Sequence, residues 1–350
     1  MSKHGFGIVG CGLIGEFHAR AIQAIPEAEL VAVADVVEAS ARRLAEKFGC
    51  RYFTDVGKML RLDEIDIVTI CTPSGLHADT AVPAAAAGKH VIVEKPLDIT
   101  LERVDRINDA ARKHGVRVCG IFPSRFHDAA QATKKAVDAG RFGRITLGDA
   151  YVKWWRSQEY YDKGGWKGTR ALDGGGALMN QSIHAIDLLQ WFMGDVEQVS
   201  AFAGTLAHER IEVEDTAVAA LRFRSGALGV IEGATSVFPG FLKRLEICGS
   251  GGSVVMEEEN IVHWKFAQEQ PEDARIREDF AAKTKTGGGA ADPAAIGFEG
   301  HRRQFVDFIR AIETRTEPLV NGEEARKAVE IILAIYRSAQ SGRPVNLPLK

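Results

Sequence analysis

The stretch that decides the fold lies near the N-terminus, where residues 5–15 read GFGIVGCGLIG. Its first half is an apolar run typical of a buried strand, and its second half is a Gly-x-Gly-x-x-Gly pattern. The amphipathic stretch over residues 13–25 predicts a helix directly after the glycines. A strand, a glycine-rich turn and a helix in this order are typical of the first βαβ unit of a dinucleotide-binding domain.

Each glycine of this pattern has a physical reason. Gly10 permits the tight turn, Gly12 lets backbone amides approach a pyrophosphate, and Gly15 allows close packing of helix on strand. Asp35 stands 20 residues beyond Gly15, at the end of the second apolar run. Its carboxylate can accept hydrogen bonds from an adenine-ribose hydroxyl and would repel a 2′-phosphate, so we expect NAD as the cofactor. The residues expected to bind it here are Gly10, Gly12, Leu13, Ile14, Gly15 and Asp35.

The pattern along the chain predicts two domains. Over residues 1–122, five short apolar runs alternate with amphipathic helical patterns, which predicts a doubly wound parallel sheet, the Rossmann fold of an NAD-binding domain. From residue 123 onward, strand-like runs follow one another around one helical pattern at 175–193. We therefore expect the α/β class, with residues 123–350 forming an α+β domain for substrate binding and oligomerisation, built on a large, mostly antiparallel open sheet. Residues 267–299, rich in charge, Gly and Pro, predict a long surface excursion.

Composition excludes several other classes. The 350 residues are 45% hydrophobic and 26% charged with a net charge of −3, which leaves no basic excess for a nucleic-acid partner. No apolar run reaches the roughly 18 residues of a membrane span. The start shows no secretory signal, and the five scattered cysteines predict reduced thiols. We expect a cytoplasmic protein with no metal site.

Three further motifs are similar to those of a known protein family. Glu94-Lys95-Pro96 follows the run HVIV, residues 71–77 read CTPSGLH, and residues 174–189 read GGGALMNQSIHAIDLL. Together with the N-terminal glycines, the chain resembles the glucose-fructose oxidoreductase/inositol dehydrogenase family over nearly its whole length. The resemblance implies an NAD(P)-dependent oxidoreductase that acts on sugars or cyclitols.

The resemblance also implies roles for individual residues. The loop with Thr72, Pro73 and His77 would lie near the nicotinamide half of the cofactor, next to the turn of Glu94 and Lys95. Lys95 would be the active-site lysine, and the pair of Trp166 and Lys167 would contact the cofactor. The family usually has Asp, three residues and His on a helix, whereas this chain has Asn180 and His184.

These residue types fit the oxidation of a hydroxyl. The imidazole of His184 can take the hydroxyl proton as the hydride leaves, and Lys95 can share that role; the sequence leaves open which of them is the base. Asn180 can donate to and accept from sugar hydroxyls. Arg156 could bind a carboxylate or phosphate, and Trp166 belongs to an aromatic segment suited to a sugar ring. His301 is a further candidate for substrate contact.

The leading function is a dehydrogenase of a secondary ring hydroxyl. The resemblance favours 3-oxidation of a glycoside or of a nucleotide-linked N-acetylated uronic sugar, with a cyclitol as another substrate class. The alternatives are an NAD-dependent glycosidase that works through transient 3-oxidation and elimination, and a non-catalytic nucleotide-dependent sensor. An open sheet face without helices predicts a homodimer or homotetramer.

Overall fold

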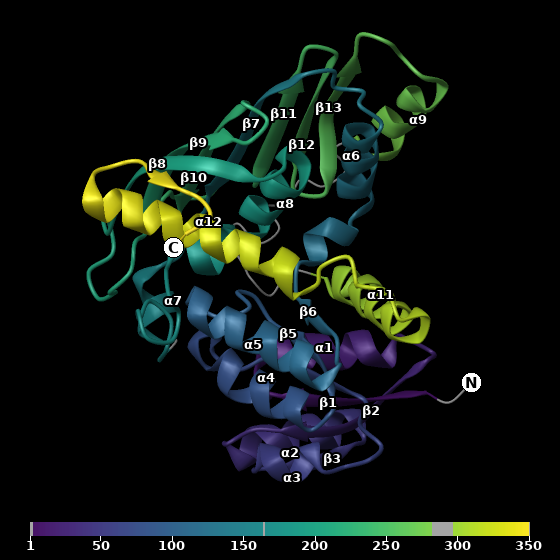
Figure 1. Cartoon of the computed structure of the whole chain (residues 1–350). Helices are drawn as coiled ribbons and strands as arrows, with labels where there is room; N and C mark the ends of the chain where they lie inside the picture. The colour runs from purple at the N-terminus through teal and green to yellow at the C-terminus, as the bar shows by residue number, and fades with distance from the viewer. Residues whose placement is uncertain (1–2, 164, 282–296, 350) are drawn as a thin grey trace. The chain divides into compact units, whose positions relative to one another are not determined.

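A six-stranded parallel sheet is built from the N-terminal third of the chain (Figure 1). The computed structural model describes residues 3–163, 165–281 and 297–349. The strand order is β3-β2-β1-β4-β5-β6. The strands are β1 (His4–Val9), β2 (Ala28–Ala34), β3 (Arg51–Phe53), β4 (Ile67–Ile70), β5 (His90–Val93) and β6 (Val118–Gly120). This is the Rossmann sheet that the alternating pattern predicts, and its central strands are apolar because both faces are covered.

Helices join the strands of this sheet. They are α1 (Leu13–Gln23), α2 (Glu38–Phe48), α3 (Val56–Leu60), α4 (His77–Ala86) and α5 (Leu101–His114). Local chemistry sets the ends of α5: the Thr100 hydroxyl accepts a hydrogen bond from the Arg103 amide, and Gly115 stops the helix in the left-handed conformation.

A late segment of the chain returns to this first unit. Unit 1 consists of residues 1–123 and 297–326, and unit 2 of residues 124–296 and 327–350. The assignment of residues 123–350 to a single second domain therefore needs correction. Helix α11 (Glu299–Thr314) buries an apolar stripe in the core of unit 1, where the rings of Phe305 and Phe6 stack 6.0 Å apart.

Unit 2 contains an eight-stranded sheet in the order β13-β12-β11-β7-β10-β9-β8-β14. Only the β7–β10 pair is parallel, so the prediction of a mostly antiparallel sheet is confirmed. The strands are β7 (Ile145–Lys153), β8 (Val196–Gly204), β9 (Thr216–Phe223), β10 (Leu228–Ala234), β11 (Arg244–Gly249), β12 (Gly252–Glu257), β13 (Asn260–Phe266) and β14 (Val345–Asn346).

One face of the eight-stranded sheet carries helices (Figure 1). They include α6 (Asp128–Asp138), α8 (Ile183–Met193) and most of α12 (Gly322–Ser341), while the short α7 (Gln158–Asp162) and α9 (Pro271–Asp279) lie in connections. Helix α8 packs on β7 and β11. It is anchored by Asp187, whose two carboxylate oxygens accept hydrogen bonds from the fully buried Arg125 at 2.7 and 2.8 Å. The helix predicted at 175–193 is in fact a π-helix, η3 (Ala177–Ser182), that continues into α8.

The opposite face of this sheet is open. On β9 the residues alternate strictly between buried and exposed, and the outward residue Val218 pairs across the strands with Phe202 of β8, which is 83% exposed. Leu228 of β10 and Leu147 of β7 form a second exposed apolar pair. An uncovered apolar row of this kind is a candidate surface for association.

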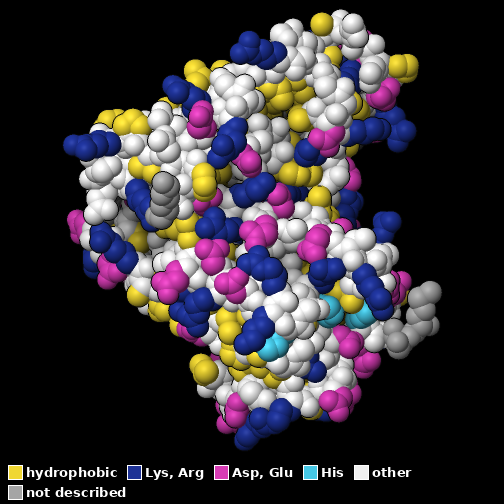
Figure 2. Space-filling view, in the orientation of Figure 1, with side chains coloured by type: hydrophobic (Ala, Val, Ile, Leu, Met, Phe, Trp, Pro, Cys, Tyr) yellow, Lys and Arg dark blue, Asp and Glu magenta, His cyan; other side chains and the backbone are white. Residues whose placement is uncertain are grey.

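The surface charge is mixed. On the face that Figure 2 shows, basic and acidic side chains are interspersed over both ends of the view, which agrees with the small net charge. No helix in the described ranges has the length and hydropathy needed to span a membrane. The predicted surface excursion is in part the helix α9, and residues 282–296 of that excursion lie outside the described residues.

Candidate active site

The glycine turn after β1 is built on two close backbone approaches. Gly10 has a φ of +97°, and a Cβ there would lie 2.5 Å from the carbonyl oxygen of Cys71. A Cβ on Gly15 would lie 2.2 Å from the carbonyl oxygen of Gly10. Both contacts are far below van der Waals distance, so only glycine fits either position.

The glycine at position 12 is explained by open space and not by a close backbone approach. A Cβ on Gly12 would meet nothing within 4 Å, so the space next to it is open. Gly12 also caps α1, and no side chain caps this helix end. The first amides of α1, from Leu13 and Ile14 onward, therefore point their unsatisfied N–H groups toward an open cradle, which is the form of a phosphate site. This geometry fits the pyrophosphate of a dinucleotide.

Asp35 is held against the glycine turn. Its Oδ2 accepts a hydrogen bond from the Cys11 amide and its Oδ1 from the Val37 amide, both at 2.8 Å. Each oxygen keeps a further lone pair for a ribose hydroxyl. Sequence reasoning missed one cation here: Arg43 of α2 donates to the Cys11 carbonyl at 3.2 Å. No motif places Arg43 there, because its approach depends on how α2 packs.

The loop of Thr72 and the turn of Lys95 are tied together by His77. The ring is fully buried, with Nδ1 lying 2.8 Å from the carbonyl oxygen of Pro96 and Nε2 lying 3.0 Å from that of Thr72. Burial lowers the pKa of His77, whereas the two carbonyl oxygens favour the protonated ring, because only the protonated ring can donate to both of them. Thr72 Oγ1 is buried and has no hydrogen-bond partner among the described residues. An orphaned hydroxyl beside Pro73 fits a loop that receives a ligand.

Glu94 and Lys95 follow β5 directly. Lys95 is half-buried, and its amide donates to Glu94 Oε2 at 3.0 Å. The Glu94 side chain, which is expected to contribute to cofactor binding, lies against two histidines of unit 1, with His18 Nε2 at 2.9 Å and His301 Nε2 at 3.5 Å from Oε1. His301, a candidate for substrate contact, thus faces this carboxylate.

In unit 2, Asn180 lies in the π-helix that precedes α8. Its Nδ2 donates to Asp173 Oδ1, and its Oδ1 accepts from Gln181 Nε2 at 2.8 Å. Asp173 is 1% exposed and accepts the Gly168 amide at 2.8 Å with its other oxygen. The carboxylate that the family usually has at this helix position is therefore absent, but a buried carboxylate touches the amide that replaces it. The orientation of the Asn180 amide is fixed by these partners.

His184 lies in the first turn of α8 and is half-buried. It follows Asn180 by four residues, as the sequence pattern requires. The irregular backbone before it has a cause. A Cβ on Gly175 would lie 2.0 Å from the Tyr336 hydroxyl, and one on Gly176 would lie 2.1 Å from the Glu214 carbonyl oxygen. Three consecutive glycines let this segment approach its neighbours closely, and π-helical turns of this kind are frequent at functional sites.

Sequence reasoning missed Glu214, which holds the start of the π-helix. Its carboxylate accepts the Leu178 amide at 2.8 Å, the Gly176 amide at 3.1 Å and the Tyr336 hydroxyl at 2.8 Å. Burial raises the pKa of Glu214 despite these bonds. A lone loop carboxylate carries no periodic signal, so only the glycines at 174–176 pointed to a special backbone here.

Arg156, which the sequence suggests as a partner for a substrate carboxylate or phosphate, is buried among protein groups. It is 3% exposed and donates to Gln181 Oε1 at 2.8 Å and to the Trp155 carbonyl at 2.9 Å. The rings of Trp154 and Tyr160 flank it at 5.2 and 5.6 Å. A cation between aromatic rings is well stabilised, and here it orients Gln181.

Trp166 and Lys167 are half-buried in the loop that Asp173 holds through Gly168. The Lys167 ammonium lies 3.8 Å from the centre of the Tyr160 ring. Lys167 thus lies on a ring whose hydroxyl accepts a hydrogen bond from Gln181, the residue that also donates to Asn180.

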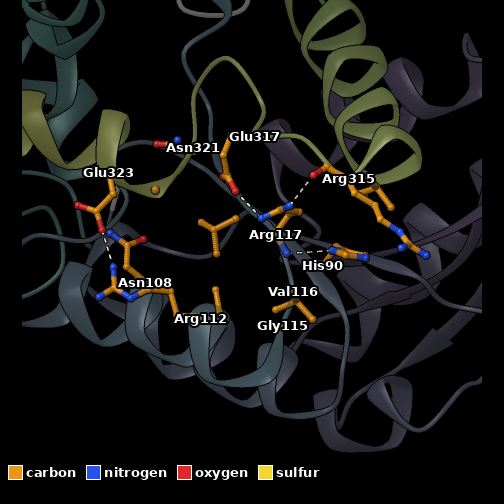
Figure 3. A pocket seen from close by; sticks show the side chains of 14 residues that line it. His90, Asn108, Arg112, Gly115, Val116, Arg117, Arg315, Glu317, Asn321 and Glu323 are labelled. Carbon is orange, nitrogen blue, oxygen red and sulfur yellow. Dashed lines mark hydrogen bonds and ion pairs between the residues drawn. The ribbon is translucent and has the colours of Figure 1, made fainter.

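A separate cavity of about 710 Å³ in unit 1 contains none of these residues (Figure 3). It is lined by α5, the end of α11 and the start of α12. Two of its arginines have carboxylate partners: Arg112 donates to Glu323 at 2.8 Å, and Arg117 pairs with Glu317. Because no predicted site residue lines it, this cavity is not the candidate site.

The glycine cradle, the acidic residue after β2 and the Rossmann sheet define an NAD-dependent oxidoreductase. The comparisons agree. Residues 4–122 match the model of the oxidoreductase family with an NAD-binding Rossmann fold, and residues 130–255 match the GFO/IDH/MocA C-terminal domain. The chain belongs to the glucose-fructose oxidoreductase/inositol dehydrogenase (Gfo/Idh/MocA) family, and the resemblance is confirmed.

Several relatives are similar over their whole length. The myo-inositol 2-dehydrogenase of Thermotoga maritima is 30% identical, over 97% of this chain and 98% of the relative. The crystal structure of the WlbA dehydrogenase from Bordetella pertussis, in complex with NADH and UDP-GlcNAcA, is 37% identical with a TM-score of 0.90 and covers 100% of this chain and 99% of that chain. The corresponding enzyme from Chromobacterium violaceum is 35% identical with a TM-score of 0.89, over 100% and 97%.

Asp35 generates a prediction about the nucleotide. The chain should bind NAD at least about tenfold more tightly than NADP, because a carboxylate at the ribose repels a 2′-phosphate. Asp35→Ser combined with Val36→Arg should reverse this preference in dissociation constants measured by isothermal titration calorimetry. As a control, Glu38→Ser removes an acidic residue that bonds to Arg42 rather than to the glycine turn, and it should change nothing. Equal binding of both nucleotides by the wild type would contradict the assignment.

Proposed function

We propose that this enzyme oxidises a secondary ring hydroxyl of a nucleotide-linked N-acetylated uronic sugar, at C3, with NAD as hydride acceptor. The observation that carries the proposal is that buried carboxylates fix the backbone next to both residues suited to proton transfer. Glu94 accepts the Lys95 amide in the turn after β5, and Glu214 accepts the Gly176 and Leu178 amides at the start of the π-helix that precedes His184. Bound NAD supplies the hydride acceptor, and the chain supplies the base and the hydroxyl contacts.

Lys95 and His184 share the hydroxyl proton in this proposal. Both side-chain types titrate reversibly and donate hydrogen bonds, so either can take the proton and the other can stabilise the developing carbonyl oxygen. Asn180 orients the substrate with an amide whose direction Asp173 and Gln181 determine. Thr72, Pro73 and Trp166–Lys167 bind the cofactor.

We assign Arg156 an indirect role. Its guanidinium is buried against Gln181, and Gln181 in turn bonds to Asn180, so Arg156 acts on the substrate through these two amides. The aromatic rings that flank Arg156 keep its geometry rigid.

The substrate class rests on the relatives. The two WlbA dehydrogenases were crystallised with UDP-GlcNAcA and are 35–37% identical to this chain, above the 30% of the inositol dehydrogenase. A nucleotide-linked uronic sugar is therefore favoured over a cyclitol.

A substrate panel tests this proposal. With NAD, UDP-GlcNAcA should yield stoichiometric NADH absorbance, whereas myo-inositol, scyllo-inositol and simple glycosides should be much poorer substrates. Lys95→Ala and His184→Ala should each lower kcat by about a hundredfold while NAD binding persists, which is typical of a lost acid–base group. Release of an aglycone without net NADH would indicate the glycosidase instead. Full turnover by either variant would remove that residue from the proton transfer.

The Asp173–Asn180 contact predicts which group is the base. Asn180→Asp alone would place two carboxylates in contact, and such a pair shares a proton. The double variant Asp173→Asn with Asn180→Asp keeps one carboxylate and moves it toward His184. The new charge should raise the imidazole pKa and move the acidic limb of the pH–kcat/KM profile upward by about 0.5 to 1 unit.

Asp173→Asn alone is the matched control, because it removes the carboxylate without adding one at residue 180. If the acidic limb of the pH–kcat/KM profile stays in place in the double variant but disappears in Lys95→Ala, Lys95 is the base.

The open face of the eight-stranded sheet supports a further part of the proposal, self-association into a homodimer or homotetramer. The exposed pair of Phe202 and Val218 lies on this face. Phe202→Lys combined with Val218→Lys should lower the molar mass measured by light scattering, whereas Val306→Lys, on an exposed apolar residue of α11, should not. A wild-type monomer would contradict the proposal.

A further inference from the structure

The Glu94 carboxylate is buried and has three donors around it. It is 7% exposed. His18 of α1 lies 2.9 Å from its Oε1 and His301 of α11 lies 3.5 Å from the same oxygen, while the Lys95 amide donates to Oε2 at 3.0 Å. The three donors come from α1, from the turn after β5 and from α11. A buried carboxyl group with this many donors is built to be an anion.

Proton positions in the cluster follow from its partners. His18 Nδ1 lies 2.6 Å from the Thr69 hydroxyl, which can donate to it, so Nε2 carries the hydrogen that His18 gives to Glu94. Burial lowers the pKa of His18, in agreement with a neutral ring. Burial raises the pKa of Glu94, but the hydrogen bonds from His18 and His301 outweigh it and hold that pKa well below its usual value. Glu94 is therefore a fixed negative charge.

The sheet order places this charge on one side of the nucleotide site. Asp35 follows β2, the glycine turn follows β1, and β4 and β5 come next in the sheet. Asp35 marks the adenine ribose and the glycine turn marks the pyrophosphate, so the nicotinamide half belongs to the carboxyl ends of β4 and β5. Glu94 is the first residue after β5.

The nicotinamide ring is positively charged in NAD⁺ and neutral in NADH. A fixed anion nearby lowers the free energy of the oxidised form only. We propose that the buried Glu94 carboxylate, held by His18, His301 and the Lys95 amide, sets the relative affinity of the enzyme for NAD⁺ over NADH. The inference rests on the NAD site and does not depend on which sugar is oxidised.

A metal ion is the competing explanation of the same cluster. His18, Glu94 and His301 have ligand atoms within 4.8 Å of one another. However, the 2.9 Å between His18 Nε2 and Glu94 Oε1 is a hydrogen-bond distance. Two ligands of a tetrahedral zinc ion, each about 2.0–2.1 Å from it, would lie roughly 3.3 Å apart. The geometry favours the hydrogen-bonded anion.

The experiment measures the ratio of the NADH and NAD⁺ dissociation constants by calorimetry, without any sugar. In Glu94→Gln, which removes the charge and keeps the shape, NADH should gain about tenfold relative to NAD⁺. His301→Lys places a permanent cation against the intact carboxylate and should shift the ratio in the same direction. If Glu94→Gln fails to fold, His301→Lys still tests the proposal.

Two controls separate charge from structure. Glu94→Asp keeps the charge and should stay within about twofold of the wild-type ratio. Glu313→Gln removes an exposed carboxylate of α11 that contacts His4, and it should also leave the ratio unchanged. A wild-type ratio in both Glu94→Gln and His301→Lys would overturn the proposal. One divalent ion per chain in metal analysis, with a ratio that changes on chelation, would overturn it in favour of the metal site.

Discussion

The Glu94 carboxylate joins three segments that are far apart in the sequence. Through His18 it contacts the helix that the glycine turn opens, through the Lys95 amide it fixes the turn after β5, and through His301 it holds the returning helix α11. A buried ionised group has to be surrounded by hydrogen-bond donors. Burying the charge without such partners would cost several kcal/mol of folding free energy. The requirement to satisfy this one anion therefore constrains the carboxyl ends of the central strands, where we propose that the cofactor binds.

Buried carboxylates also hold the backbone in the second unit, where different residues supply them. Asp173 and Glu214 are both buried. Asp173 accepts hydrogen bonds from the Gly168 backbone amide and the Asn180 side-chain amide, and Glu214 accepts them from the Gly176 and Leu178 backbone amides. Together they impose the π-helix and orient Asn180 ahead of His184. In both units a buried carboxylate holds a short irregular stretch of backbone, and the residue proposed for proton transfer lies in or directly after that stretch.

The sequence predicted most of what local chemistry determines. Both sheets and the close backbone approaches at Gly10 and Gly15 were predicted correctly, because strand periodicity and glycine sterics act over a few residues. Helix α11 is amphipathic, but the pattern of its apolar stripe does not tell which unit covers that stripe. The burial of Arg156 likewise depends on Gln181, 25 residues away, and the contacts of Asp173 and Glu214 depend on how loops pack. Side chains that meet through tertiary packing leave no pattern in the sequence.

The proposed reaction moves a hydride from a sugar ring to NAD. The most direct measurement uses the proposed nucleotide sugar with deuterium at C3, in a single turnover followed by mass spectrometry of the reduced cofactor. The reduced nicotinamide should carry one deuterium, and the sugar should become the 3-oxo product. Reduced cofactor without deuterium, or no reduced cofactor at all, would contradict it.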